Sequence, residues 1–468
     1  VRLCLSPAVR VCYNIITDGS RIRSRRKSSG SGNVGCTTTL KGHPQMNLIE
    51  QLNAETREER LDALREIKAR TDAGELPAPE RTGYVNNHIH TIYSFSPYSP
   101  TMAVYRAWQS GLCTAGIMDH DSVSGVLEFI EAGQIIGMPT TIGCECRVDM
   151  SKTAVAGHRI NNPDQDSVAY VAMHGIPHQN IYVIDAFFEK YRRYRNERNY
   201  RMCKKIDELM KPYGMSLDFK RDVLPLSCAW EGGSVTERHI LFALAKKLTA
   251  RYQTPEELVA FLEGDMKLPL SAKVRAQLLA GRDTPEFYEY DILGALKSNM
   301  VEKFYIPATY ECPDVREYIE ICKACGAISA YAYLGDVGDS VTGDKKAQKF
   351  EDDYLDALMP ELKHLGFNAV TYMPTRNTKE QLTRLMKLCH EYGFFEISGE
   401  DINSPRQSFI CRAMDDGMFS HLVDATYALI GHENSATESL DAGLFSDKAV
   451  SDDPDLYSRI KKQADKAR

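Results

Sequence analysis

The sequence contains no run of about 18 consecutive apolar residues, the length that a helix needs to cross a membrane. It also lacks a strong net charge, since 57 basic and 64 acidic residues give a formal charge of −7 at pH 7. A surface that coats nucleic acid broadly needs a large basic excess, which this composition does not supply. We therefore expect no membrane span, and we expect any contact with phosphate groups to be confined to a local site.

The 13 cysteines also lack a repeated CxxC frame. Cys322 and Cys325 form a lone CxxC within a helical pattern, and Cys144 and Cys146 alternate on a predicted strand. We interpret them as reduced, partly buried thiols of a cytoplasmic protein. Redox or zinc chemistry at Cys322 and Cys325 is the alternative.

The first 45 residues differ in composition from the rest of the chain. A basic cluster is followed there by serines and glycines: Arg21, Arg23, Arg25, Arg26 and Lys27, then Ser28, Ser29, Gly30, Ser31 and Gly32. No apolar segment follows these charges, as a signal peptide would require. We predict that residues 1–45 form a disordered basic leader, because they offer too little apolar surface to offset the entropy of ordering. A nucleic-acid or targeting tail is the alternative.

Residues 46–82 are predicted to form an N-terminal helix and a linker. Thr56 and Glu59 have the spacing of a capping box, which marks the start of a helix. Apolar residues recur after it at helical spacing: Leu61, Leu64 and Ile67.

Residues 83–468 alternate between strand and helix patterns. The predicted strands lie near residues 84–90, 115–118, 140–144, 327–333, 367–372 and 394–398. Strands that alternate with helices indicate a largely parallel sheet, and closed barrels of this kind collect their chemistry at the C-terminal strand ends. The segment from about 186 to 300 is mostly helical and is predicted to be an insertion into this barrel.

Metal-ligating residue types lie at the ends of four predicted strands. They are His88 and His90, Asp119 and His120, Glu145, and Asp401. Two histidines two positions apart on a strand point to the same side. Imidazoles and carboxylates gathered at strand ends can surround a divalent ion, which makes hydroxide from water near neutral pH. A lone His-x-His is weak evidence, but four such pieces in this order are much stronger.

This order of motifs resembles the PHP family (polymerase and histidinol phosphatase), over roughly residues 83–430. The family's members are metal-dependent phosphoesterases, so the resemblance implies an α/β fold, a distorted (β/α)7 barrel with a helical insertion. The nearest branch acts on nucleotides and short RNA.

The resemblance also implies which metal positions this chain keeps. One family metal corresponds to His88, His90, Glu145 and Asp401, which are all present. Other ligand positions hold groups that bind divalent metals poorly, namely Phe95, Tyr333 and Asn403. A further expected histidine has no clear equivalent among His158, His174 and His178. We expect one tightly bound divalent ion (Zn, Mn, Fe or Mg) rather than three, with a weak second site at Asp119 and Asn403.

Three residues are candidates for catalysis. His120 is suited to general acid–base chemistry. Arg238 and His239 resemble a helix start in the family's insertion, which covers the active site in those relatives; an ordinary capped helix start is the alternative. Upstream, Arg192, Arg193, Arg195, Arg198 and Arg201 make the start of the insertion basic. This segment is interpreted as a solvated helix face, or alternatively as a lid that faces phosphate.

The leading functional hypothesis is a metal-dependent hydrolase, a phosphoesterase acting on a small phosphorylated substrate. The alternative is a catalytically degenerate PHP protein that binds a phosphorylated ligand, because several metal positions are replaced. A third, less favoured class is a nucleic-acid-processing factor, for which Tyr191, Tyr194 and Tyr200 within the basic segment offer stacking surfaces.

Overall fold

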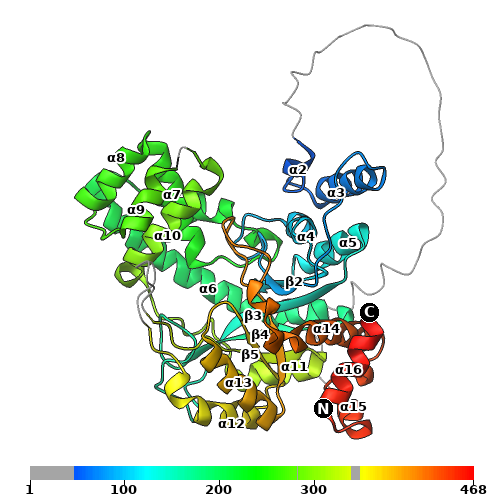
Figure 1. Ribbon diagram of the computed structural model, residues 1–468. Coiled ribbons are helices and arrows are strands. Elements are labelled where there is room, and N and C mark those ends of the chain that lie inside the picture. Colours follow the sequence, from blue (N-terminus) through cyan, green and yellow to red (C-terminus); the bar gives the residue numbers. More distant parts are fainter. Residues whose placement is uncertain (1–46, 282, 339–347) are drawn as a thin grey trace, which may run out of the picture. The chain divides into compact units, whose positions relative to one another are not determined.

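The computed structural model describes residues 47–281, 283–338 and 348–468 (Figure 1). The predicted basic leader, residues 1–45, lies outside the described residues. Within them, seven strands form one sheet in sequence order. The strands are β1 (Val85–Ile89), β2 (Thr114–His120), β3 (Thr140–Asp149), β4 (Val168–His174), β5 (Ile328–Ala332), β6 (Ala369–Tyr372) and β7 (Phe395–Ser398).

The sheet is parallel except at its centre, where β4 runs antiparallel to both β3 and β5. Its two edges meet just beyond β7. There the His90 N–H donates to the Ile402 carbonyl at 2.9 Å, and the Ile402 N–H donates to the His88 carbonyl at 3.1 Å. The expected distorted (β/α)7 barrel with a helical insertion is confirmed, and β4 is a strand that the sequence pattern did not identify.

Helices surround the strands in the order that the alternating pattern predicts. Those outside the insertion are α2 (Leu48–Gln51), α3 (Arg57–Asp72), α4 (Pro100–Gln109), α5 (Val126–Ile136), α11 (Val315–Cys325), α12 (Leu355–Leu365), α13 (Lys379–Tyr392), α14 (His421–Glu438), α15 (Asp447–Asp452) and α16 (Leu456–Ala467). Among the described residues, no helix has the length and apolar character needed to cross a membrane.

The first long helix, α3, begins where the sequence pattern places it. The Thr56 hydroxyl accepts the Glu59 N–H, and the Glu59 carboxylate accepts the Thr56 N–H, which completes a capping box. On the buried face of α3, Arg60 makes a 2.5 Å ion pair with Glu128 of α5. The N-terminal helix is therefore tied directly to the barrel's own helices.

The insertion is helical and has its own hydrophobic core. Its helices are α6 (Ile181–Met210), α7 (Glu237–Arg251), α8 (Pro255–Ala260), α9 (Ala272–Leu279) and α10 (Pro285–Phe304), and Figure 1 shows α7 to α10 grouped together. Residues of these helices and of their connections form one buried apolar cluster, here called the insertion core. One residue from the loop after β1, Phe95, belongs to the insertion core as well.

The basic residues of α6 do not share a single environment. Arg192, Arg195 and Arg198 are buried at three-residue spacing, whereas Arg193 and Arg201 are exposed. The expectation of a solvated face is therefore wrong for three of these five arginines. The spacing places the buried three on one side of the helix, toward the barrel.

A buried group of ion pairs joins α6 to the barrel. This paired cluster consists of Arg147, Arg195, Arg198, Asp121, Glu237 and Glu311. Arg198 Nη2 donates to Glu311 Oε1 at 2.9 Å, and Arg195 Nε lies 2.9 Å from Asp121 Oδ2. Three guanidinium groups thus face three carboxylates, and each charge has a partner inside the cluster.

Candidate metal centre

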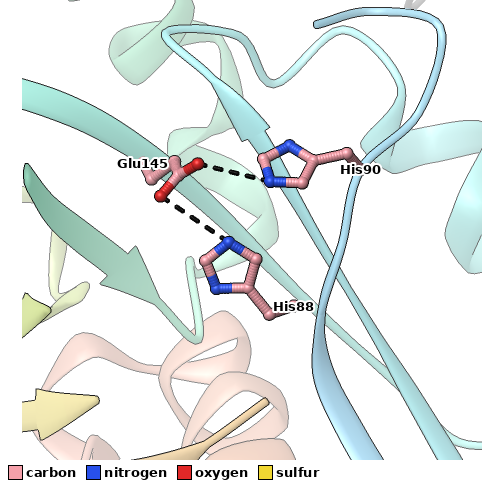
Figure 2. Close-up of side chains that lie close together, drawn as sticks. All are labelled: His88, His90 and Glu145. Atoms are coloured by element: carbon pink, nitrogen blue, oxygen red, sulfur yellow. Dashed lines mark ion pairs between the residues drawn. The ribbon is translucent and has the colours of Figure 1, made fainter. Parts of the chain in front are cut away.

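His88, His90 and Glu145 form a compact group at the C-terminal edge of the barrel (Figure 2). The nitrogen and oxygen atoms that they offer all lie within 4.8 Å of one another. The two carboxylate oxygens of Glu145 face the two rings, with His88 Nε2 at 3.6 Å and His90 Nε2 at 3.3 Å. The parallel register of β1, β2 and β3 brings these side chains together, as the strand-end motifs led us to expect.

A chain of hydrogen bonds fixes the His90 ring from behind. The Ser94 hydroxyl donates to Asp119 Oδ1 at 2.6 Å, and His90 Nδ1 lies 3.1 Å from the same hydroxyl. Because Ser94 gives its proton to Asp119, it accepts one from His90 Nδ1. In the neutral ring, His90 Nε2 then carries the lone pair and points at Glu145.

The Asp119 carboxylate is fully engaged in this support. Besides Ser94, it accepts the Thr91 backbone N–H at 2.7 Å and the Thr91 hydroxyl at 2.6 Å. Asp119 is buried, and these bonds turn both of its oxygens toward the loop after β1. The structure thus places Asp119 behind His90.

Asp401 and His120 complete the surroundings of the group. Asp401 Oδ1 lies 3.3 Å from His90 Nε2 and accepts the Asn403 side-chain amide at 2.6 Å. His120 Nδ1 lies 3.0 Å from Glu145 Oε1. Asn403, predicted as part of a weak second site, here orients Asp401.

The electrostatics of the group favour a bound cation. Burial alone would lower the pKa of His90, but the nearby Asp401 carboxylate, whose Oδ1 faces His90 Nε2, and the charge of Glu145 raise it to about 8. Burial alone would raise the pKa of Glu145, yet the neighbouring imidazoles of His120, His88 and His90 lower it to about 2. Burial lowers the pKa of His120 to about 3. Ionised carboxylates therefore surround imidazoles, an arrangement that positive charge stabilises.

These residues fit a divalent metal ion. His90 Nε2 and His120 Nδ1 are buried, and neither makes a hydrogen bond with any described residue. Orphaned imidazole nitrogens that face a carboxylate are the donor set that zinc and similar ions use. His88, His90, Glu145 and Asp401 would hold the ion, with His120 beside them.

The other histidines considered from the sequence are outside this group, although His174 lies close enough to interact electrostatically with His88 and Glu145. His158 packs against Tyr354 with ring centroids 4.6 Å apart, and His178 pairs with Glu433 at 2.9 Å. His174 is buried on β4, opposite Gly143, and its Nε2 has no partner among the described residues. None of the three belongs to the His/Glu group.

Two other replaced positions have acquired structural partners. The Tyr333 hydroxyl donates to Asp352 at 2.6 Å. The Phe95 side chain is buried in the insertion core. Neither group offers a strong ligand for a divalent metal.

Gly399 is required by a close approach to His88. A Cβ atom at position 399 would lie 2.7 Å from the His88 Cβ and 2.8 Å from the His88 nitrogen. A side chain there would displace the metal-ligand candidate, so the glycine belongs to the architecture of the site.

A cavity of about 420 Å³ opens above the group and is walled by both the barrel and the insertion. Its lining includes four basic side chains: Arg195, Arg238, Lys297 and Arg376. Arg195 belongs to the paired cluster, but Arg238, Lys297 and Arg376 form no ion pair with any described residue. Unpaired positive charge beside candidate metal ligands suits an anionic ligand.

The structure separates the roles of Arg238 and His239. Arg238 lines the cavity, and its Nε is buried without a hydrogen-bond partner among the described residues. His239 Nδ1 accepts the Thr236 N–H at 3.0 Å, which caps the start of α7, and its ring is buried. His239 is not among the residues that line the cavity.

Sequence reasoning missed three residues of this site. Lys297 and Arg376 stand in ordinary helix and loop patterns, and only the folded chain brings them to the cavity. Ser94 stands directly before Phe95 and carries no sequence motif of its own. Its spacing of four from His90 could have suggested a contact, because a short loop after a strand often folds back on it.

The sequence similarity to known proteins covers a short stretch of the chain. No family model matches the chain. Over 75 residues the chain is 35% identical to the error-prone DNA polymerases of Mycobacterium bovis and Mycobacterium tuberculosis. That stretch is 15% of this chain and spans only 7% of the polymerases' length.

Two solved structures are similar over most of the chain. One is a proposed metal-dependent phosphoesterase from Bifidobacterium adolescentis, with a TM-score of 0.45, 20% identity, and coverage of 73% of this chain and 97% of that one. The other is an amidohydrolase from Chromobacterium violaceum with bound sulfate, with a TM-score of 0.47, 14% identity, and coverage of 70% and 90%. The fold described above rests on the chain's own strand order and register.

Proposed function

We propose that this protein is a metal-dependent hydrolase that cleaves a phosphoester of a small substrate. One observation carries the proposal. Basic side chains without ion-pair partners among the described residues line the same cavity as His88 and Glu145 of the His/Glu group. The basic side chains would bind phosphate, and the His/Glu group would bind one divalent ion, such as Zn, Mn, Fe or Mg. A cavity of about 420 Å³ falls within the usual range for small-molecule sites.

The chain's own residues have distinct roles in this proposal. His88, His90, Glu145 and Asp401 would hold the ion, which when bound supplies Lewis acidity toward water and a phosphoryl oxygen. Arg238 and Lys297 would orient the phosphate from the insertion side, and Arg376 from the barrel side. Water would bond to phosphorus as the ester bond breaks, and His120 would take the water proton and return it to the leaving oxygen.

The experiment that tests the proposal combines metal analysis with a screen of phosphomonoesters. Elemental analysis of the purified protein should give about one divalent metal per chain. Asp401→Ala should remove both metal and turnover, whereas His120→Ala should keep most of the metal and lose turnover. His421→Ala is a matched control, because His421 pairs with Glu396 at 3.3 Å and does not line the cavity. Wild-type turnover by Asp401→Ala would show that the proposed site is wrong.

The second candidate function is a PHP-like protein that binds a phosphorylated ligand without cleaving it. The replacements at Phe95, Tyr333 and Asn403 favour it, because each of these side chains now has a structural partner. This candidate predicts saturable phosphate binding without turnover under any of the four metals. A nucleic-acid-processing role is less favoured, and a salt-dependent gel shift with short RNA would test it.

A further inference from the structure

Phe95 connects the candidate metal centre with the insertion. It lies in the loop after β1, next to Ser94, yet its buried ring belongs to the insertion core. The ring packs edge-on against His239, with centroids 4.9 Å apart, and against Phe242 at 5.6 Å. Tyr290 of α10 lies 5.9 Å away. The loop after β1 also contacts the insertion through Tyr93, whose hydroxyl donates to Glu231 at 3.2 Å, but Phe95 is the loop residue that enters the insertion core.

The Arg238 guanidinium lies over the ring of Phe95. Its central carbon is 5.0 Å from the ring centroid, within the range of a cation–π interaction. No described residue forms an ion pair with Arg238, and its Nε is buried without a hydrogen-bond partner. The ring face is therefore the contact that fixes where this positive charge stands at the cavity wall.

The same loop also supports His90. Ser94 bonds the back of the His90 ring and Asp119, while its neighbour Phe95 supports Arg238. Two consecutive residues thus set the positions of a metal-ligand candidate and of an anion-binding candidate. A displacement of the loop would move both groups together.

We infer that Phe95 is a positioning residue for anion binding, and that its ring holds the Arg238 guanidinium in place at the cavity. This inference rests on the proposed function only in taking phosphate as the anion that Arg238 binds. Phe95 occupies a position where the family resemblance implies a metal ligand. Phe95 cannot bind a metal ion as a ligand would, but its ring supports the Arg238 guanidinium.

The test uses inorganic phosphate as the probe and isothermal titration calorimetry of the full chain, with and without added metal. Phe95→Leu keeps apolar volume but removes the ring face, so phosphate binding should weaken by about 3- to 30-fold. Phe95→Tyr keeps the face and should retain wild-type affinity. In an Arg238→Ala background, Phe95→Leu should cause less than a twofold further change, because the two residues act through one another.

Phe242→Leu is the matched control for damage to the insertion core. Phe242 touches the same ring, but the described contact of Arg238 is with Phe95. Phe242→Leu should therefore leave phosphate affinity within about twofold of wild type, because it keeps the Phe95 ring face on which the Arg238 guanidinium lies. Equal losses in Phe95→Leu and Phe242→Leu, or an undiminished loss in the Arg238→Ala background, would overturn the inference. Wild-type protein that binds no phosphate would overturn it as well.

A second measurement needs no variant and remains decisive if Phe95→Leu does not fold. Hydrogen exchange of the wild-type protein should show that phosphate protects residues 236–240, at the start of α7, together with residues 93–98. Protection confined to residues 236–240 would contradict the coupling. Failure of the hydrolase proposal would appear separately, as phosphate binding without turnover.

Discussion

The molecule contains two buried clusters of charge at the same edge of the barrel, and they differ in completeness. In the paired cluster, Arg147, Arg198 and Glu311 satisfy one another with short ion pairs. In the candidate metal centre, His90 Nε2 and His120 Nδ1 have no hydrogen-bond partner among the described residues. Burial and perturbed pKa values occur in both, so neither property identifies a functional site. Arg147 Nε and Arg195 Nε of the paired cluster also lack hydrogen-bond partners among the described residues, but every charge there faces an opposite charge. The second cluster is distinguished by the kind of atom left without a partner, since imidazole nitrogens can bind a metal and guanidinium nitrogens cannot.

The largest effect should come from breaking the paired cluster. Glu311→Gln would leave the three buried arginines of the cluster with only two carboxylates, Glu237 and Asp121, which should lower the free energy of unfolding by about 3–5 kcal/mol. Urea unfolding of the full chain measures this loss. Metal affinity of the protein that remains folded should be unchanged, because Glu311 does not line the cavity. If the variant lost metal affinity without losing stability, the paired cluster would belong to the metal site and would not act mainly on stability.

A substitution in the candidate metal centre should instead lower metal affinity more than it lowers stability. Glu145→Gln should weaken metal binding by more than about 100-fold, beyond the range found for outer-shell changes, because it removes a direct ligand. The metal-free variant should lose less stability than Glu311→Gln, because it gives up charge interactions with the neighbouring imidazoles but leaves every buried arginine paired. Competition with a metal-sensitive dye and a melting curve after chelation would measure the two effects. Metal binding equal to wild type would exclude Glu145 as a ligand.

A smaller effect should follow when the support behind His90 is removed. Ser94→Ala breaks the link to Asp119, so metal affinity should fall by about 10- to 100-fold while the direct ligands remain. Ser96→Ala is the matched control, because Ser96 lies in the same loop and, among the described residues, its hydroxyl hydrogen-bonds to the Tyr98 backbone N–H, at 3.4 Å, and not to His90 or Asp119. Equal affinities in the two variants would mean that the hydrogen-bond chain does not orient His90.

The smallest effect concerns a histidine that already has its partner. The hydrogen bond from His178 to Glu433 raises the pKa of His178 above its ordinary value of 6.5. The folded state therefore holds this proton more tightly, and the stabilisation is complete below pH 6.5 and is lost as pH rises through the raised pKa. His178→Gln should flatten this part of the stability profile, measured by urea unfolding between pH 6 and 9, and leave metal binding unchanged. A profile identical to wild type would show that the pair does not couple to folding.

The barrel could be predicted from the sequence because metal-ligating residue types stand near the C-terminal ends of several predicted strands. His88 and His90 stand at the end of β1, Glu145 follows the apolar start of β3, and Asp401 follows β7, and parallel strands bring such positions to one edge. Strand β4 was missed because Val168–His174 is a short, nearly continuous apolar run that no helix introduces. Such a run does not distinguish a strand from a buried helix by its periodicity.

The partners of the arginines could not be predicted. The spacing of Arg192, Arg195 and Arg198 indicates a shared helix face, but their environment depends on residues far away in sequence. Glu311 lies 113 positions from Arg198, and no local pattern marks it as a partner. Phe95 could be recognised only as a lost ligand, because its contact with Arg238 exists only once the insertion has folded onto the loop.

The contacts between β1 and the segment just beyond β7 determine the order in which the candidate metal ligands come together during folding. The Asn86 side chain donates to the Glu400 carbonyl, 314 positions further along the chain, at 3.1 Å. During synthesis, β1 and β3 can bring His88, His90 and Glu145 together early, but Asp401 is added 256 positions after Glu145. Contacts of such long range form slowly, because a large loop must close first. A newly made chain would therefore bind a metal ion weakly before its barrel closes and tightly afterwards. The rise in metal affinity would report the closure of the barrel.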